Sequence, residues 1–150
     1  DVCSSDLGSI IKTQVKGGRK IMDIIKSDIE RMLEEKIWAV IGVSPNQEKF
    51  GYKIWKVLLD NGYEAYAINP KYDEIEGSKC YPSLRDLPVK PDVIDFVVPP
   101  RISINGVEEA KELGIDNLWF QPGSWNQEVL DKADSLGLTH VEDCVYAILK

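Results

Sequence analysis

Short apolar runs alternate with amphipathic stretches along most of this chain. Residues 37–41 (IWAVI) form a continuous apolar run, which is typical of a strand buried on both faces of a parallel sheet. Three later stretches repeat one order of an amphipathic helix, a glycine and a strand: LLDNGYEAYAI, AKELGIDNLWF and ADSLGLTHVED. Strands joined by helices pair in parallel through right-handed crossovers. The pattern therefore predicts a doubly wound α/β/α sandwich.

The same periodicities give the extent of each expected element. A capping box at residues 27–30 (SDIE) is expected to start a short helix. Residues 71–91 interrupt the alternation, with a strand-like segment at 79–81 and a short helix near 84–87. The remaining helices are expected at 51–61, 103–113 and 126–136, and the remaining strands at 37–41, 64–68, 92–98, 117–120 and 139–142.

The first 21 residues differ from the rest of the chain. They lack clean periodicity, and they carry four basic and two acidic side chains in a chain whose net charge is −7. We expect residues 1–21 to be a non-native or disordered extension. No composition break divides the remainder, so residues 22–150, which begin at Met22, are predicted to form one domain.

Charge and cysteine content exclude several classes of protein. The acidic balance argues against a nucleic-acid-binding protein, which needs a basic face. No apolar run approaches the roughly 20 residues that a membrane span needs. Cys3, Cys80 and Cys144 lie far apart, without a C-x-x-C pair or a histidine cluster, so neither a disulfide framework nor a metal site is expected. A reducing, cytoplasmic location is the simplest interpretation.

Ligands of open α/β sheets bind outside the carboxyl ends of the strands, which here are followed by four loops. The first, residues 42–51 (GVSPNQEKFG), has neither the G-x-G-x-x-G fingerprint nor the P-loop pattern. Gly42 nevertheless permits a close backbone approach, and the following helix offers free N–H groups that suit a diphosphate. An ordinary polar loop explains the same residues.

The second loop, Asn69-Pro70-Lys71, distinguishes better between ligands. An NAD-binding domain usually has an acidic residue there, bonded to the ribose 2′-hydroxyl. A cation instead favours a phosphorylated ribose, as in NADP or in coenzyme A (CoA) with its 3′-phosphate. The alternative is that Lys71 is a solvated surface lysine.

The third and fourth loops contain Val98-Pro99-Pro100 and Gln121-Pro122-Gly123. The two prolines lack N–H donors and form a stiff apolar edge, which is suited to the wall of a slot for pantetheine. Proline after a strand is also common as a simple strand terminator. The four loops together are therefore more informative than any one of them.

From Trp38 onward the sequence resembles a known family, the stand-alone CoA-binding domain proteins. These are similar in turn to the N-terminal CoA-binding domain of the succinyl-CoA synthetase α subunit. The segments that carry the resemblance are VIGVSPNQEKFGYKIWKVLLDNGYEAYAINPKYDEIEG, CYPSLRDLP, VVPP, AKELGIDNLWFQPG and EDCVYAI. The resemblance implies a Rossmann-like, mostly parallel sheet that binds CoA or an acyl-CoA across its strand ends. The phosphohistidine segment of the synthetase has no counterpart here, so synthetase chemistry is not implied.

By position, the resemblance places the first loop at the diphosphate, Lys71 at the nucleotide phosphates and the third loop beside the pantetheine. The cofactor-binding residues that we expect are Gly42, Val43, Ser44, Pro45, Asn46, Gln47, Asn69, Pro70, Lys71, Val98, Pro99, Pro100, Phe120, Gln121, Pro122 and Gly123.

Catalytic constellations are scarce in the sequence. No motif places a carboxylate or a nucleophile beside His140, so a structural role is favoured over that of a base. Cys144 could face the thiol of pantetheine, but its acidic neighbours disfavour a reactive thiolate, and burial is the preferred interpretation. We therefore expect a CoA-binding protein without catalytic residues. The alternatives are an NAD(P)-binding redox or regulatory module, or a non-catalytic subunit of an acyl-CoA ligase; assembly as a homo-oligomer is left open.

Overall fold

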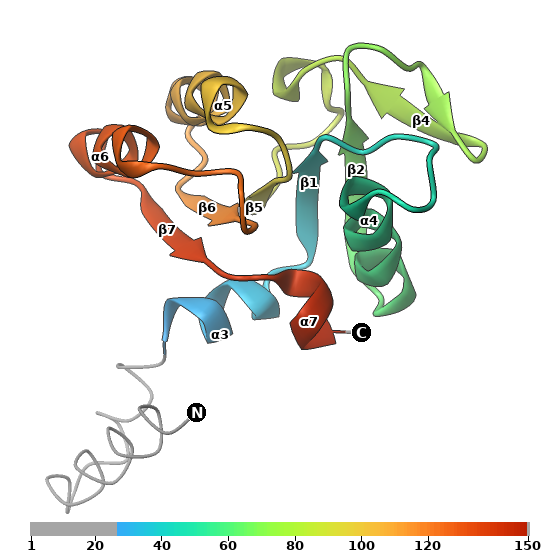
Figure 1. Ribbon diagram of the computed structural model, residues 1–150, viewed down its shortest axis with the longest axis horizontal. Coiled ribbons are helices and arrows are strands. Elements are labelled where there is room, and N and C mark those ends of the chain that lie inside the picture. The colour runs from blue at the N-terminus through green and yellow to red at the C-terminus, as the bar shows by residue number, and fades with distance from the viewer. Residues whose placement is uncertain (1–26, 150) are drawn as a thin grey trace, which may run out of the picture.

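The computed structural model describes residues 27–149, so the expectation for residues 1–21 lies outside the described part. A seven-stranded sheet runs through the centre in the order β3-β4-β2-β1-β5-β6-β7 (Figure 1). Its strands are β1 (Ile37–Ile41), β2 (Glu64–Ile68), β3 (Glu74–Ile75), β4 (Ser78–Tyr81), β5 (Val93–Phe96), β6 (Asn117–Phe120) and β7 (Thr139–Glu142). All neighbours pair in parallel except β3 and β4, which form an antiparallel hairpin.

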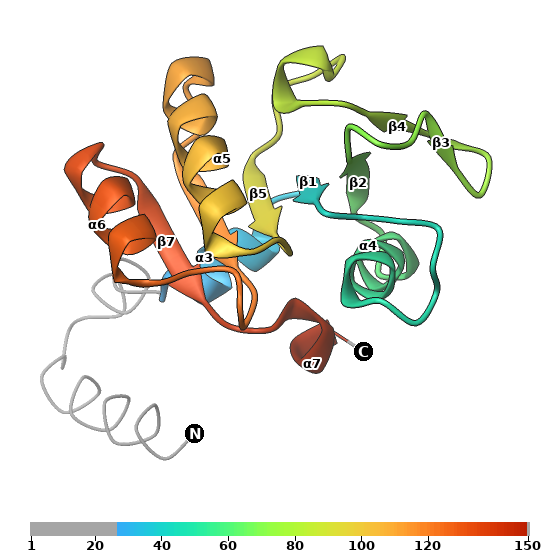
Figure 2. The ribbon, with the colours of Figure 1, turned by 45° about the horizontal axis from the view of Figure 1, so that its top comes forward.

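Helices cover both faces of the sheet. They are α3 (Asp28–Glu34), α4 (Phe50–Asp60), α5 (Pro100–Leu113), α6 (Gln127–Ser135) and α7 (Val145–Leu149), with a 3₁₀ turn η1 (Leu84–Asp86). One core cluster joins α3, α4 and α7 to the sheet, and a second joins α5, α6 and η1 to its opposite face (Figure 2). The prediction of a Rossmann-like, doubly wound α/β domain is thus confirmed.

The register of the central strands explains why they are apolar on both sides. Val40 lies beside Asp95, and Asp95 lies beside Trp119, so these three residues form one row across β1, β5 and β6. Residues of the next row, such as Ile94 and Leu118, belong to the core cluster of the opposite face. Buried on both faces, these strands need no polar alternation.

The structure departs from the expected elements at several points. The strand expected at 92–98 is shorter, since β5 spans only Val93–Phe96. The helix expected from residue 103 begins at Pro100, with Pro99 as its N-cap. A proline at the first helical position lacks only an N–H that would have no intrahelical partner, so it starts a helix as well as ending a strand. The two-residue strand β3 and the five-residue helix α7 were not expected, because both are too short for a periodic pattern.

The order of the strands determines where a ligand can sit. Strand β1 pairs with β2 on one side and with β5 on the other; the chain runs from β1 through α4 to β2 and later crosses back past β1 to β5. Ligands of open α/β sheets bind at this kind of switch point. None of the helices between residues 27 and 149 is long and apolar enough to cross a membrane.

Candidate ligand-binding site

A cavity of about 610 Å³ opens at this switch point, between the loops that follow β1, β2 and β5. Its size lies within the usual range of small-molecule sites, roughly 300–1,000 Å³. Eight of the residues expected to bind the cofactor line it: Gly42, Ser44, Asn46, Asn69, Pro70, Lys71, Val98 and Pro99. The structure therefore brings the first three predicted loops together around one space.

Two glycines bring the first loop back against the sheet. Gly42 has a φ of +108°, and a Cβ built on it would lie 2.5 Å from the carbonyl oxygen of Val97. A Cβ on Gly51 would lie 2.0 Å from the carbonyl oxygen of Gly42. Both contacts are far shorter than a side chain permits. The glycines thus hold the first turn of α4 against the end of β1, beside the cavity.

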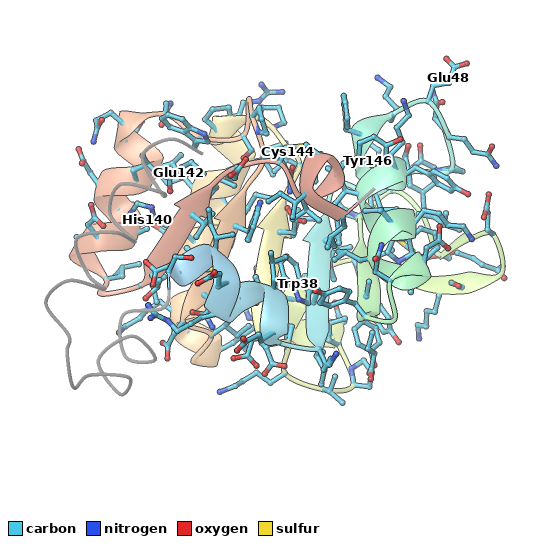
Figure 3. All side chains as sticks on the ribbon, turned by 90° about the horizontal axis from the view of Figure 1, so that it is seen from below. Trp38, Glu48, His140, Glu142, Cys144 and Tyr146 are labelled. Carbon is cyan, nitrogen blue, oxygen red and sulfur yellow. The ribbon has the colours of Figure 1, made fainter. Side chains whose placement is uncertain are left out.

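Side chains within the first loop fix its shape. The Ser44 hydroxyl accepts a hydrogen bond from the N–H of Asn46 (3.2 Å), and Asn46 Oδ1 accepts one from the N–H of Glu48 (3.0 Å). Such bonds hold a turn without help from secondary structure. Glu48 lies at the outer edge of the loop and points away from the body of the protein (Figure 3).

Asn69 joins the second loop to the first. Its Nδ2 donates to the carbonyl oxygen of Val43 (2.9 Å), and its Oδ1 accepts from the N–H of Lys71 (2.9 Å). Asn69 and Lys71 both line the cavity. This amide therefore sets the path of the backbone that carries the lysine.

Two lysines face the cavity without counter-charges. Neither the Lys49 nor the Lys71 ammonium group has a hydrogen-bond or ion-pair partner among residues 27–149, and no acidic side chain of this part of the chain lines the cavity. Lys49 is also the N-cap of α4 and makes no capping bond with its side chain. A cation is unfavourable at that end of a helix, where Ser, Thr, Asp or Asn is preferred. An anion bound in the cavity would relieve this conflict.

The loop after β5 and the start of α5 give the cavity an apolar wall. It is formed by Val97, Val98, Pro99 and Ile102, and the side chain of Ile102 is 41% exposed. A smaller hollow of about 220 Å³ adjoins Val97–Pro99 on the side of Pro122 and Gly123. An elongated ligand with a charged and an apolar part would fit this division of the lining.

The fourth loop contributes little to the main cavity. Phe120 is fully buried and stacks on Phe96, with ring centroids 4.7 Å apart. Gln121 is buried as well: its Nε2 donates to Asp95 Oδ1 (2.7 Å), and its Oε1 accepts from the N–H of Val145 (3.2 Å). Burial raises the pKa of Asp95 to about 8, although the bond from Gln121 lowers it in part. Asp95 is therefore protonated at neutral pH, and Gln121 holds it and the start of α7 together.

The other expected residues lie outside the main cavity. Val43 is buried, Pro45 and Gln47 lie on the first loop, and Pro100 is the first residue of α5; none of the four lines the cavity. Conversely, Lys49, Phe50 and Ile102 line it and were not among the expected residues. Lys49 could not be recognised as an N-cap from the sequence, because the helix was expected to begin at residue 51, one residue later than it does.

His140 and Cys144 lie on β7 and on the segment that leads into α7 (Figure 3), and neither lines the cavity. The His140 ring bonds to Asp134 (2.9 Å) and to Glu142. Burial lowers the pKa of His140, but the two carboxylates outweigh it and raise the pKa above its ordinary value. No cluster of potential metal ligands occurs among residues 27–149.

Comparison with known proteins identifies relatives of this chain. The ADP-forming acetate–CoA ligase I of Archaeoglobus fulgidus is 43% identical over 81 residues, which cover 54% of this chain and 12% of the ligase. The uncharacterized protein YneT of Bacillus subtilis is 30% identical over 119 residues, covering 79% of this chain and 88% of YneT. The chain thus spans only a small part of the ligase but most of the length of YneT.

Solved structures also include proteins that are similar to this chain over most of its length. A hypothetical protein from Pyrococcus horikoshii OT3 superposes with a TM-score of 0.75 and 38% identity, covering 82% of this chain and 89% of that one. Residues 36–150 match the family described as the CoA binding domain. This match includes every strand of the sheet and all three loops around the cavity. The chain therefore belongs to the CoA binding domain family.

Proposed function

We propose that the cavity binds CoA or an acyl-CoA. The observation that carries this proposal is the division of its lining between loops: the loops after β1 and β2 each contribute a lysine without an ion-pair partner among residues 27–149, and the loop after β5 is apolar. CoA has the same division, since its phosphates are anionic and its pantetheine arm is long and thin. Membership of the CoA binding domain family supports the same ligand.

In this proposal each part of the ligand meets a different loop. The diphosphate lies at the first turn of α4, near Lys49, where helix N–H groups and the helix dipole favour an anion. Lys71 binds the 3′-phosphate of the ribose. The pantetheine arm follows the apolar wall at Val98 and Pro99 toward the adjoining hollow.

Titration calorimetry with CoA, acetyl-CoA, NAD, NADH and NADPH tests the proposal. We expect saturable, one-to-one binding of CoA or acetyl-CoA and no comparable heat with the nicotinamide nucleotides. Binding of NAD, NADH or NADPH without binding of CoA would overturn it and would favour a nicotinamide-nucleotide module.

A charge reversal tests the role of Lys71. We expect Lys71→Glu to weaken the binding of CoA more than that of dephospho-CoA, because only CoA carries the 3′-phosphate. Lys111→Glu is the matched control, since Lys111 is an exposed lysine in the last turn of α5 and does not line the cavity. Equal losses for both ligands in Lys71→Glu would mean that Lys71 contacts another part of CoA.

The match to part of a ligase supports a second, narrower role. We propose that the CoA site can serve an acyl-CoA ligase whose remaining functions reside outside residues 1–150. The chain alone is then expected to bind CoA but to form no acetyl-CoA from acetate, ATP and CoA. Formation of acetyl-CoA and ADP by the purified chain would contradict this role and the expectation that the chain has no reaction of its own.

A further inference from the structure

Glu76 occupies an unfavourable backbone conformation in the β3–β4 hairpin. It has a φ of +52°, and it is the sole non-glycine residue with a positive φ among those that the structure describes. Only Glu76 and Gly77 separate the paired residues Ile75 and Ser78. Two-residue hairpins with two positive φ angles strongly prefer Asn-Gly or Asp-Gly. A glutamate is therefore kept here against the preference of the turn.

The side chain of Glu76 connects the hairpin to two other segments. Its Oε2 accepts hydrogen bonds from Gln47 Nε2 (2.8 Å) and from the hydroxyl of Tyr52 (2.7 Å). Gln47 belongs to the first loop, and Tyr52 belongs to the first turn of α4. The loop runs beside the hairpin in both ribbon views (Figures 1 and 2). One carboxylate thus joins the hairpin, the loop and the helix.

Both hydrogen bonds favour the ionised form of this carboxylate. The bonds from Tyr52 and Gln47 lower the pKa of Glu76, and the bond to Glu76 raises the pKa of Tyr52. Charge-assisted bonds of this kind are stronger than neutral ones. Glu76 is accordingly an ionised acceptor, and Tyr52 a protonated donor, at neutral pH.

Gln47 lies between two residues of the cavity. Asn46 precedes it, Lys49 follows two residues later, and both line the cavity, whereas Gln47 does not. The bond from Gln47 to Glu76 thus holds the outer side of the segment whose inner side faces the ligand. A loop that is ordered before binding loses less conformational entropy when the ligand arrives.

We propose that Glu76 is a positioning residue, which holds residues 46–49 in the shape that binds the phosphates of CoA. This inference rests on the proposed CoA function. It gives Gln47 an indirect role: the amide acts on the ligand through the loop and not by direct contact. It also explains why the hairpin has Glu at a position that favours Asn.

The variant Glu76→Asn separates positioning from a merely structural role. Asparagine suits the turn, but it is one methylene shorter and cannot make both bonds. We expect an unchanged or higher melting temperature together with CoA binding weakened about five- to tenfold. Loss of a carboxylate near an anion site would by charge alone strengthen binding, so the expected sign is opposite to that of simple electrostatics.

Two further variants complete the test. Gln47→Met removes the donor from an exposed loop and is expected to weaken CoA binding by a similar factor. The double variant should bind no worse than Glu76→Asn alone, because Glu76→Asn already breaks the bond that Gln47→Met removes. Glu74→Gln, an exposed carboxylate on the same hairpin, is the charge control and should leave the affinity within twofold.

The outcomes distinguish this inference from the proposed function. If the unmodified chain binds CoA and Glu76→Asn binds it equally or more tightly, the positioning role is wrong and the proposed function stands. If the unmodified chain does not bind CoA, the proposed function fails, and this inference fails with it. Additive losses in the double variant would also contradict it.

Discussion

The first and fourth loops both follow parallel strands, yet their polar groups serve different ends. In the first loop, residues 42–51, Lys49 lines the cavity, and its ammonium group has no hydrogen-bond or ion-pair partner among residues 27–149. In the fourth loop, residues 121–125, Gln121 is 2% exposed and bonded at both ends of its amide. The charge of Lys49 in the first loop is thus available to a ligand, whereas the polar groups of the fourth loop bond to other parts of the protein and stabilise the fold.

The path of the chain after β7 explains this difference. The indole of Trp119 donates to the carbonyl oxygen of Asp143 (2.8 Å), and Gln121 accepts from the N–H of Val145. These bonds tie the start of α7 to the end of β6, so the fourth loop is partly covered. At the end of β1, by contrast, the loops that follow β1, β2 and β5 surround a cavity. A ligand site in this fold therefore depends both on the strand ends and on which of them a neighbouring helix, such as α7, covers.

The largest effect is expected from Gln121→Leu, which breaks the fourth-loop network. Leucine is of similar size but leaves the Asp95 carboxyl and the Val145 N–H without the bonds that they now make. Buried polar groups without partners cost about 1–3 kcal/mol each. We expect the free energy of unfolding in urea to fall by about 3 kcal/mol, while CoA affinity of the folded variant stays within twofold. Unchanged stability with a large loss of affinity would reverse our assignment of the two loops.

A smaller effect, with a definite pH dependence, is expected from Asp95→Asn. The Asp95 carboxyl titrates near pH 8 in the folded protein and near 3.8 when unfolded. Between these values the folded state holds a proton that the unfolded state releases, so stability falls as the pH rises, by at most about 1.4 kcal/mol per unit. Asparagine does not titrate and removes this slope.

Urea unfolding of both proteins from pH 5 to pH 6.5 measures this effect. We expect the difference in unfolding free energy to move in favour of Asp95→Asn by about 2 kcal/mol over this range. The bond from Gln121 can be kept, because the Asn side-chain oxygen also accepts. Parallel pH profiles for the two proteins would mean that Asp95 is ionised in the fold despite its burial.

The sequence was sufficient for the parallel strands of the sheet and for the end of the sheet at which the cavity opens. The strands at 37–41, 64–68, 117–120 and 139–142 have the bounds that apolar periodicity predicts. Periodicity succeeds there because these strands are long enough to show which faces are buried. The rule that ligands bind at the carboxyl ends of parallel strands predicts a site at the loops after β1, β2, β5 and β6, of which the first three surround the cavity.

The hydrogen-bond partners of individual polar side chains could not be predicted in this way. The sequence places Gln121 at a strand end, and this position predicts an amide that binds the ligand. Its actual partners, Asp95 and Val145, lie 26 and 24 residues away. Glu76 likewise meets Gln47 across 29 residues. Such pairings depend on how helices, strands and loops pack together, and local sequence patterns do not predict them.

The smallest effect, and one confined to binding, is expected from Lys49→Gln. Lys49 places a cation at the N-terminal end of α4, so its loss is expected to leave the free energy of unfolding unchanged or to raise it by up to about 0.5 kcal/mol. The same change removes a charge from the cavity and should weaken CoA binding about tenfold, which corresponds to about 1.4 kcal/mol. Lys111→Gln, which removes an equal charge at the far end of α5, should leave the affinity unchanged. Equal losses of affinity in the two variants would mean that CoA binding responds to net charge alone. The free lysine of the first loop and the fully bonded glutamine of the fourth would then say nothing about where CoA binds.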